Sequence, residues 1–444
     1  MEDPVAVRRP IPLTTQSIML LALMFGAVAA QAGQRFDTAA AVATIHEFQS
    51  LCRRENGVLW GRSLCGPFIA IDPQSGTAAA SDSPGAPGFR RVGDVAIGPI
   101  PEGVPFANTA FDWQGARWLV LLLPVPGDSY HRAAVLLHEA FHRIQPALGL
   151  NRPDAMNPHL DERDGRVWLR LELRALGRAI AGSGAAARQT LGDAVLFRAR
   201  RYQRYPEARE REELLEISEG LAEYTGMAAA RRLLGTPIAV VVEDLTGFEK
   251  RRSFVRSLGY GTGPAMGSLL DRYRPGWRRQ VATEGFAAQL ARVAPALPPS
   301  DRISLRADAR AVRYGNHEIA AEEDARAVER NRRIAEYRGL FIDGPALIIP
   351  ATGANRSFNP NTLFPLPGGG TVYPTGEFTA PWGVLEISDH GALLSDDLSS
   401  LRVTAPIRTT ADSAIGEGWR LRLNPGWAIK PGTKPGESVL AESP

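Results

Sequence analysis

The stretch His138-Glu139-Ala140-Phe141-His142 decides how the middle of this chain folds. It lies in a segment for which we predict one helix over residues 129–145, because a serine that can cap a helix opens it and a proline follows it. On a helix, positions i and i+4 share a face, so His138 and His142 can both direct an imidazole nitrogen at one ion. Glu139 lies about 100° further round the axis, where it can take a proton from a metal-activated water. The motif therefore predicts a zinc centre with a glutamate as general base.

A second His-Glu pair shows what the motif requires. His317-Glu318 has the same opening, but Ala321 stands where a second ligand would be needed. We interpret that pair as surface residues. Only seven histidines occur in the chain, so two at the i, i+4 spacing around a glutamate are a specific signal.

A catalytic zinc needs a third protein ligand and an open position for water. The best candidate segment is Glu219-Gly220-Leu221-Ala222-Glu223-Tyr224. HExxH followed by a helix that contains E-G-x-A resembles the gluzincins, the thermolysin-like and aminopeptidase-like metallopeptidases. The resemblance covers mainly residues 128–145 and 212–226. It implies that Glu219 is the third zinc ligand and that Glu223 holds a ligand histidine by a hydrogen bond.

The chain departs from that family in two respects. His142 and Glu219 are 219 − 142 = 77 positions apart, more than the few tens of positions usual in the family. No G-x-M-E-N segment occurs, so aminopeptidase specificity is not supported. The competing carboxylates Glu172, Glu213 and Glu216 are interpreted as solvated or ion-paired helix residues.

Two further elements of the site are expected. Tyr260, in a glycine-rich segment that enters a helix, is the candidate donor of a hydrogen bond to a developing oxyanion. A partly buried aromatic ring with no such role is the alternative. The resemblance also implies an edge strand that holds the substrate backbone, for which residues 106–123 are placed suitably and Asn108 to Phe111 are the candidates.

The N-terminus predicts export. Arg8 and Arg9 precede an apolar run over residues 18–28, and Ala30-Gln31-Ala32 fits the small-x-small rule for signal cleavage. We therefore expect a signal peptide over residues 1–32 and a periplasmic or extracellular protein that starts at Gly33. The run is shorter than the roughly 20 residues that span a bilayer. An uncleaved N-terminal membrane anchor is the alternative.

The two cysteines support the same compartment. Cys52 and Cys65 lie 13 positions apart, and in an exported protein such a pair predicts one disulfide that closes a short loop. A pair of metal ligands would need closer spacing and a neighbouring His or Cys.

We predict an α+β fold in several parts. The signal peptide is followed by a strand-rich region over residues 33–127, a mainly helical zincin catalytic region over 128–342, and a small all-β module over 343–444. Within these parts we expect a surface loop over 75–87, a hairpin turn over 112–116 and a short strand over 238–242.

Composition limits the partners. The chain carries 51 basic and 48 acidic residues, a net charge of +3, and the two signs are interleaved. We therefore expect no nucleic-acid partner, and no contact with a membrane beyond the signal or anchor segment. The sequence makes no prediction of oligomeric state.

These patterns give a first hypothesis: an exported zinc metallopeptidase that acts on a peptide or protein substrate. One alternative is an inactive zincin-fold scaffold that binds partners through the β module, although such a protein would not need Glu139. The other is a zinc hydrolase of non-peptide amides or esters, since the same activated water serves these reactions.

Overall fold

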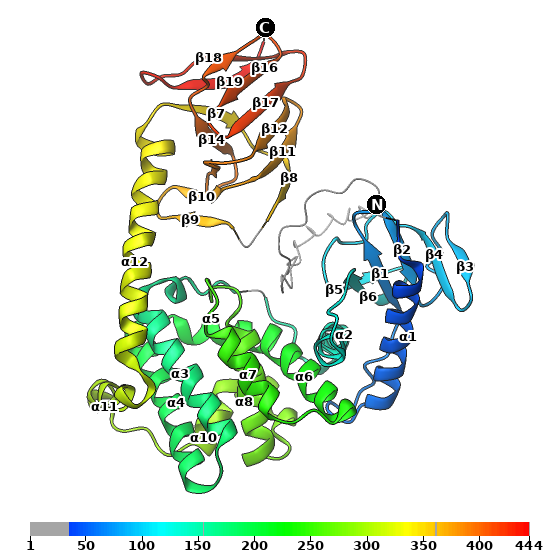
Figure 1. Ribbon diagram of the computed structural model, residues 1–444, viewed down its shortest axis with the longest axis vertical. Helices are drawn as coiled ribbons and strands as arrows, with labels where there is room; N and C mark the ends of the chain where they lie inside the picture. The colour runs from blue at the N-terminus through cyan, green and yellow to red at the C-terminus, as the bar shows by residue number, and fades with distance from the viewer. Residues whose placement is uncertain (1–34, 154, 360–361, 444) are drawn as a thin grey trace, which may run out of the picture. The chain divides into compact units, whose positions relative to one another are not determined.

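The fold is α+β, as predicted: an N-terminal sheet, a central helical region and C-terminal β-sheets (Figure 1). The computed structural model describes residues 35–153, 155–359 and 362–443, so the expected signal peptide and its cleavage point lie outside the described residues. The chain forms two compact units that divide between Glu323 and Asp324. This division falls inside helix α12 (Asn316–Arg338), while residue 343 marks the change from helix to strand.

The first unit opens with helix α1 (Thr38–Glu55) and a six-stranded sheet of order β3-β4-β2-β1-β6-β5. The strands are β1 (Phe68–Asp72), β2 (Thr77–Ala80), β3 (Arg90–Val92), β4 (Val95–Pro99), β5 (Thr109–Trp113) and β6 (Ala116–Leu122). β1 and β6 are parallel and the other pairs are antiparallel. Among the described residues β5 pairs on one side only, with β6, so it is an edge strand of this sheet.

β2 corrects the predicted loop over residues 75–87. Its alanines carry little strand propensity, and the segment around them is rich in turn residues. The backbone of β2 nevertheless pairs on both sides, with β1 and β4, and Ala78 to Ala80 are fully buried. Small side chains fit this crowded part of the sheet. The crowding comes from the neighbouring strands, so the local sequence pattern does not reveal it.

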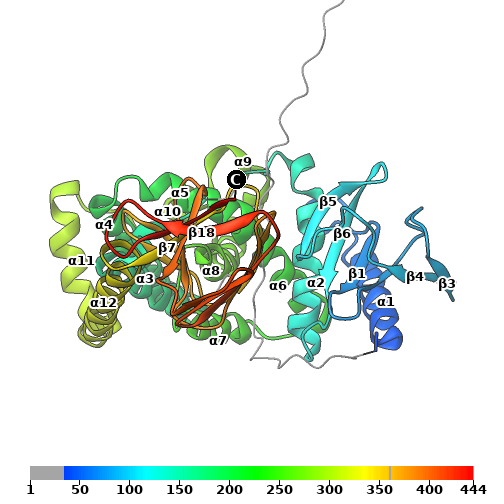
Figure 2. The ribbon, with the colours of Figure 1, turned by 90° about the horizontal axis from the view of Figure 1, so that it is seen from above.

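Helix α2 (Ser129–Ile144) packs on one face of this sheet (Figures 1 and 2). Leu119 and Leu121 of β6 share a hydrophobic core with α2, while Trp118 and Val120 face a smaller core on the opposite side. Asp128, rather than Ser129, caps the helix: its carboxylate accepts from the backbone N–H of His131 at 2.8 Å. The core thus holds α2 rigidly against the sheet.

The rest of the first unit is helical. Its α-helices are α3 (Arg163–Ala181), α4 (Gly184–Arg204), α5 (Ala208–Leu215), α6 (Leu221–Leu234), α7 (Ala239–Phe248), α8 (Leu258–Tyr273), α9 (Val281–Glu284), α10 (Phe286–Val293) and α11 (Ile303–Ala311). Short 3-10 turns are η1 (Pro146–Leu148), η2 (Pro158–Asp161), η4 (Trp277–Arg279), η5 (Ser300–Arg302) and η6 (Val312–Tyr314). A π-helical turn, η3 (Glu216–Gly220), joins α5 to α6, and α6 packs along α2.

The predicted strand over residues 238–242 is wrong, because this segment is the start of helix α7. A run of β-branched residues favours a strand by propensity. Val241, Leu245 and Phe248 recur at helical spacing, however, and all three are buried. Packing of that face against α3 and α8 overrides the local preference.

Cys52 and Cys65 form the predicted disulfide, with their Cα atoms 5.1 Å apart. The loop that they close carries Trp60, whose ring lies 5.0 Å from the ring of Phe141 in the HExxH motif. The Trp60 indole N–H also donates to Thr225 of α6 at 2.9 Å. The disulfide loop therefore packs behind the helix that carries the motif.

The second unit continues α12 into a π-helical turn, η7 (Gly339–Asp343), and two β-sheets. The seven-stranded sheet has the order β18-β19-β7-β14-β13-β10-β9, and the six-stranded sheet has the order β15-β16-β17-β12-β11-β8. Their strands are β7 (Ala346–Pro350), β8 (Asn355–Phe358), β9 (Phe364–Leu366), β10 (Gly370–Tyr373), β11 (Gly376–Ala380), β12 (Gly383–Ile387), β13 (Ala392–Leu394), β14 (Ser400–Thr404), β15 (Arg408–Thr409), β16 (Ser413–Gly416), β17 (Trp419–Leu423), β18 (Trp427–Pro431) and β19 (Ser438–Glu442). Alternating side chains such as Phe378, Leu385 and Leu421 form a separate core, as the predicted all-β module requires.

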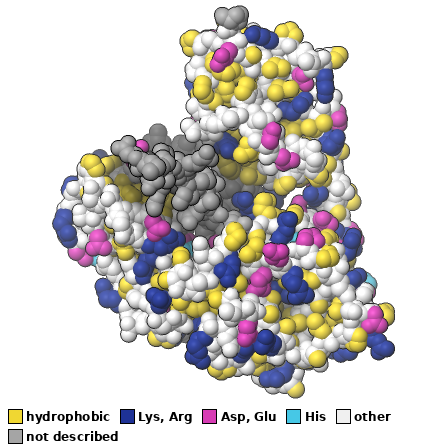
Figure 3. All heavy atoms as spheres, turned by 180° about the vertical axis from the view of Figure 1, so that it is seen from behind, with side chains coloured by type: hydrophobic (Ala, Val, Ile, Leu, Met, Phe, Trp, Pro, Cys, Tyr) yellow, Lys and Arg dark blue, Asp and Glu magenta, His cyan; other side chains and the backbone are white. Residues whose placement is uncertain are grey.

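Two properties of the surface and the helices bear on partners. On the face shown in Figure 3, basic and acidic side chains are interspersed over both units. In the described part of the chain, no helix combines the length and the apolar character needed to cross a membrane.

Candidate metal centre

The two histidines of α2 and Glu219 of η3 converge on one point. The Nε2 atoms of His138 and His142 lie 3.1 Å apart, and Glu219 Oε2 lies 3.5 Å and 3.6 Å from them. Two ligands of a tetrahedral zinc ion at ordinary bond lengths lie about 3.3 Å apart. The three predicted ligand atoms therefore have the spacing of three corners of a zinc site, and these side chains fit the ion.

The hydrogen bonds of the imidazoles fix which nitrogen faces the centre. His138 Nδ1 lies 2.7 Å from Glu223 Oε2, and His142 Nδ1 lies 2.8 Å from Gln145 Oε1. Both partners are acceptors, so each Nδ1 carries a hydrogen, and each Nε2 is the ring nitrogen that faces the other predicted ligands. In the neutral rings these two Nε2 atoms would each offer a lone pair to a cation placed between them. Glu223 thus has the position that the sequence predicted for it.

Gln145 is a site residue that the sequence analysis missed. Its signal was present: it stands three positions after His142, so the two side chains share a helix face. The sequence pattern places residue 145 only at the end of the predicted helix. Its side chain is buried, with 5% of its surface exposed.

Glu139 is buried beside the predicted ligands, but its carboxylate does not belong to the group of atoms that could hold one ion. Its Oε1 lies 4.0 Å from His138 Nε2, and no Lys or Arg of the described residues forms a salt bridge with it. Burial raises the pKa of Glu139, and the nearby carboxylates Glu219 and Glu223 add to this effect, while the two histidines oppose it. A buried carboxylate with a raised pKa has the properties of a general base.

Glu219 is ionised in this setting. Burial disfavours its charge, but His142 and His138 outweigh burial and hold its pKa well below the ordinary value. The same pairing raises the pKa of both histidines, although burial alone would lower it. The protein groups thus hold a negative charge where a metal ion would need one.

Tyr260 of α8 lies against the ligands. Its hydroxyl donates to Glu219 Oε2 at 2.6 Å, and its ring stacks on the His138 ring with centroids 5.7 Å apart. Burial and the neighbouring Glu219 raise the pKa of Tyr260 well above its ordinary value, so the hydroxyl keeps its proton. Glycines allow α8 to come this close: a Cβ on Gly263 would lie 2.1 Å from the carbonyl oxygen of Gly220.

The competing carboxylates lie elsewhere. Glu172 and Glu216 are buried in salt bridges with Arg198, and Glu213 accepts from the backbone N–H of Phe286 at 2.7 Å. None of the three belongs to the His138–His142–Glu219 group. The second His-Glu pair, at residues 317 and 318, is exposed.

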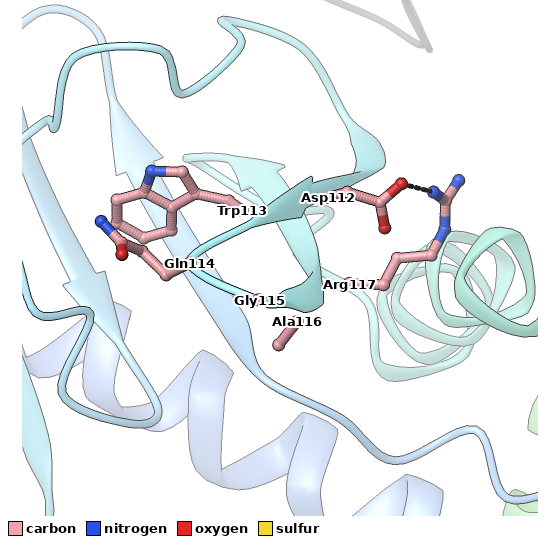
Figure 4. A pocket seen from close by; sticks show the side chains of 6 residues that line it. All are labelled: Asp112, Trp113, Gln114, Gly115, Ala116 and Arg117. Carbon is pink, nitrogen blue, oxygen red and sulfur yellow. Dashed lines mark hydrogen bonds and ion pairs between the residues drawn. The ribbon is translucent and has the colours of Figure 1, made fainter.

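The candidate substrate strand is β5, at the edge of the sheet beside α2. Asn108, just before it, accepts from the backbone N–H of Leu122 at 2.8 Å and so extends the pairing with β6. The predicted hairpin turn follows β5. Residues 112–117 line a hollow there, where Asp112 and Arg117 pair on one side and Trp113 points to the other (Figure 4). This hollow contains none of the predicted metal-site residues.

No protein-family model, no curated protein and no solved structure matches this chain. The resemblance to gluzincins therefore rests on the sequence motifs alone and stays a prediction.

Proposed function

We propose that this chain is an exported zinc-dependent metallopeptidase. One observation carries the proposal: His138 Nε2, His142 Nε2 and Glu219 Oε2 converge at the spacing of zinc ligands, with the buried Glu139 beside them. Export is supported by the N-terminal sequence and by the Cys52–Cys65 disulfide, which persists in oxidising compartments.

Each residue of the proposed site would have a separate role in peptide hydrolysis. Zinc, when bound, would polarise the substrate carbonyl and make a bound water acidic. Glu139 would accept a proton from the attacking water and later return it to the leaving amine. Glu223 and Gln145 hold the ligand imidazoles in the tautomer that binds a metal through Nε2.

Tyr260 has two roles within the proposal. In the structure its hydroxyl donates a hydrogen bond to Glu219, which steadies the third ligand. During the reaction the same hydroxyl would turn to the oxyanion that develops on the substrate carbonyl. Its raised pKa keeps the proton available for both roles.

The edge of β5 that pairs with no described strand would hold a peptide. Trp113 and Ala116 close a two-residue hairpin, with Gln114 and Gly115 at positive φ as a type I′ turn requires. Pairing then alternates along the strand, so Ala110 and Asp112 direct their backbone N–H and C=O groups away from β6. An extended substrate could add to these groups as a further strand.

Cleavage of a mixed peptide library tests the proposal. Purified protein loaded with zinc should produce new peptide termini, and a chelator should stop this. The Glu139→Gln variant is the matched control for a contaminating protease, because it changes one atom of the buried carboxylate. Absence of cleavage by the zinc-loaded protein, together with hydrolysis of simple esters or non-peptide amides, would replace the peptidase with the alternative hydrolase.

A further inference from the structure

Gln145 contacts both a metal-ligand helix and the turn that carries the third ligand. Its Oε1 accepts from His142 Nδ1, and its Nε2 donates to the backbone carbonyls of Ile217 and Ser218, at 3.0 Å and 2.9 Å. Ile217 and Ser218 immediately precede Glu219 in η3. One buried carboxamide therefore joins two ligands that lie 77 positions apart in the sequence.

The polarity of this amide is determined by its surroundings. Backbone carbonyls can only accept hydrogen bonds, so the NH2 group of Gln145 must face Ile217 and Ser218. The amide oxygen is then directed at His142, which can satisfy it only by donating from Nδ1. The orientation of the amide thus fixes the tautomer of His142 and leaves its Nε2 lone pair for a metal.

The turn that Gln145 contacts has carbonyl groups in an unusual arrangement. In η3 the backbone N–H of Leu221 bonds to the carbonyl of Glu216, five positions back. Such π-helical insertions disturb the regular i→i−4 ladder and occur frequently at functional sites. Because buried carbonyls need donors, the two N–H groups of Gln145 stabilise the turn in the form that directs Glu219 at the histidines.

The backbone of Gln145 is held in place by hydrogen bonds. Residue 145 ends α2 with helical backbone angles, and its N–H bonds to the carbonyl of Phe141. Its own carbonyl accepts from the N–H groups of Leu148 and Leu150. Because the backbone of Gln145 is fixed at the end of α2, its side chain holds η3 at a set position relative to α2.

We propose that Gln145 is the positioning residue of the metal centre: its carboxamide sets the tautomer of His142 and clamps the π-helical turn that places Glu219. This inference rests on the proposed zinc centre. It adds that the second and third ligands are set by one side chain, while Glu223 serves the first ligand, His138.

The test compares two substitutions. Gln145→Met keeps the length of the side chain and removes all three hydrogen bonds. Gln203→Met is the matched control, since Gln203 also donates to a backbone carbonyl, that of Ser300, but on the exposed surface. Loss of a hydrogen-bonding partner of a ligand typically weakens metal binding 10- to 100-fold. We expect a loss of about that size for Gln145→Met and none for Gln203→Met, measured by competition with a zinc-binding chromophore.

A second measurement needs no variant, so it decides the matter if Gln145→Met does not fold. In the wild-type protein labelled with 15N-glutamine and 15N-histidine, both side-chain N–H protons of Gln145 should exchange slowly with water. The His142 Nδ1 should carry a proton. Fast exchange at Gln145, or an unprotonated His142 Nδ1, would overturn the inference.

The outcomes separate this inference from the function on which it rests. If the wild-type protein binds no zinc, both fail. If the wild-type protein binds zinc and Gln145→Met binds it equally tightly, even with reduced stability, the peptidase proposal stands and the role of Gln145 is refuted.

Discussion

The first unit contains two buried clusters of charged residues that meet at the π-helical turn η3. The two clusters compensate their buried negative charge in different ways. In one, carboxylates alternate with guanidinium groups: Arg201 bonds Glu212 and Glu172, and Arg198 bonds Glu172 and Glu216. In the other, Glu139, Glu219 and Glu223 form no salt bridge with any Lys or Arg of the described residues, and each lies within 4.0 Å of a histidine nitrogen.

This difference separates a structural network from the proposed metal site. Buried carboxylates are costly unless paired, and the first cluster supplies the pairing from its own side chains. The second leaves its lone pairs directed at one point, which a cation would satisfy. Glu216 belongs to the first cluster and Glu219 to the second, although they lie three positions apart.

The largest effect is expected from removing a ligand. His138→Ala or His142→Ala should abolish zinc binding, because the remaining groups no longer enclose the ion. Wild-type protein should hold about one zinc per chain, removable by a chelator. His317→Ala, in the exposed second His-Glu pair, is the control and should keep its zinc. If elemental analysis finds no metal in wild-type protein from zinc-replete expression, the second cluster is not a zinc site, and the contrast between the two clusters no longer holds.

Glu139→Gln should separate binding from chemistry. The variant should keep its zinc, because Glu139 is not a ligand, and should lose roughly 10²- to 10⁴-fold in turnover, because an amide accepts no proton. Glu318→Gln, in the exposed pair, should leave turnover unchanged. Near-normal turnover of Glu139→Gln on a cleaved peptide would assign the base to another group.

Local patterns predicted the parts of the site that depend on helix geometry alone. The i, i+4 spacing of His138 and His142, and that of Glu219 and Glu223, places each pair on one face wherever the helix forms. The disulfide and the hairpin turn over residues 112–116 were likewise readable, because each depends on short spacing.

The contacts that the sequence did not reveal depend on tertiary structure. A helical pattern continues through residues 207–233, so nothing in it indicates the π-helical turn. In an uninterrupted α-helix, Glu216 and Glu219 would share a face. In the structure they diverge, one toward Arg198 and one toward the histidines. The role of Gln145 follows from that turn, and so it could not be predicted either.

The structural network should respond to substitution in stability rather than in metal binding. Glu212→Ala leaves Arg201 with one carboxylate in a fully buried position, which should lower the free energy of unfolding by about 3–5 kcal/mol. Zinc affinity of the folded variant should not change. Asp94→Ala, which breaks an exposed pair with His46, should leave the free energy of unfolding close to that of the wild type. Chemical denaturation and zinc titration measure both quantities, and a Glu212→Ala protein as stable as wild type would contradict the role given to the network.

The smallest effect concerns the charge balance within the network, where three carboxylates meet two guanidinium groups and the His159 imidazole, which lies 2.7 Å from Glu212. Burial raises the pKa of Glu216 from 4.5 to about 7, against the opposing effect of Arg198. A pKa raised on folding stabilises the protein fully below the unfolded value of 4.5, and this contribution is lost as the pH rises through 7. The loss between pH 4.5 and pH 8 should be on the order of 3 kcal/mol. Glu216→Gln carries no titrating group and should lack this part of the pH dependence, while all other groups titrate in both proteins and cancel from the difference. Parallel pH profiles of unfolding for the two proteins would mean that Arg198 keeps Glu216 ionised throughout, and that the network needs no proton to balance its charge.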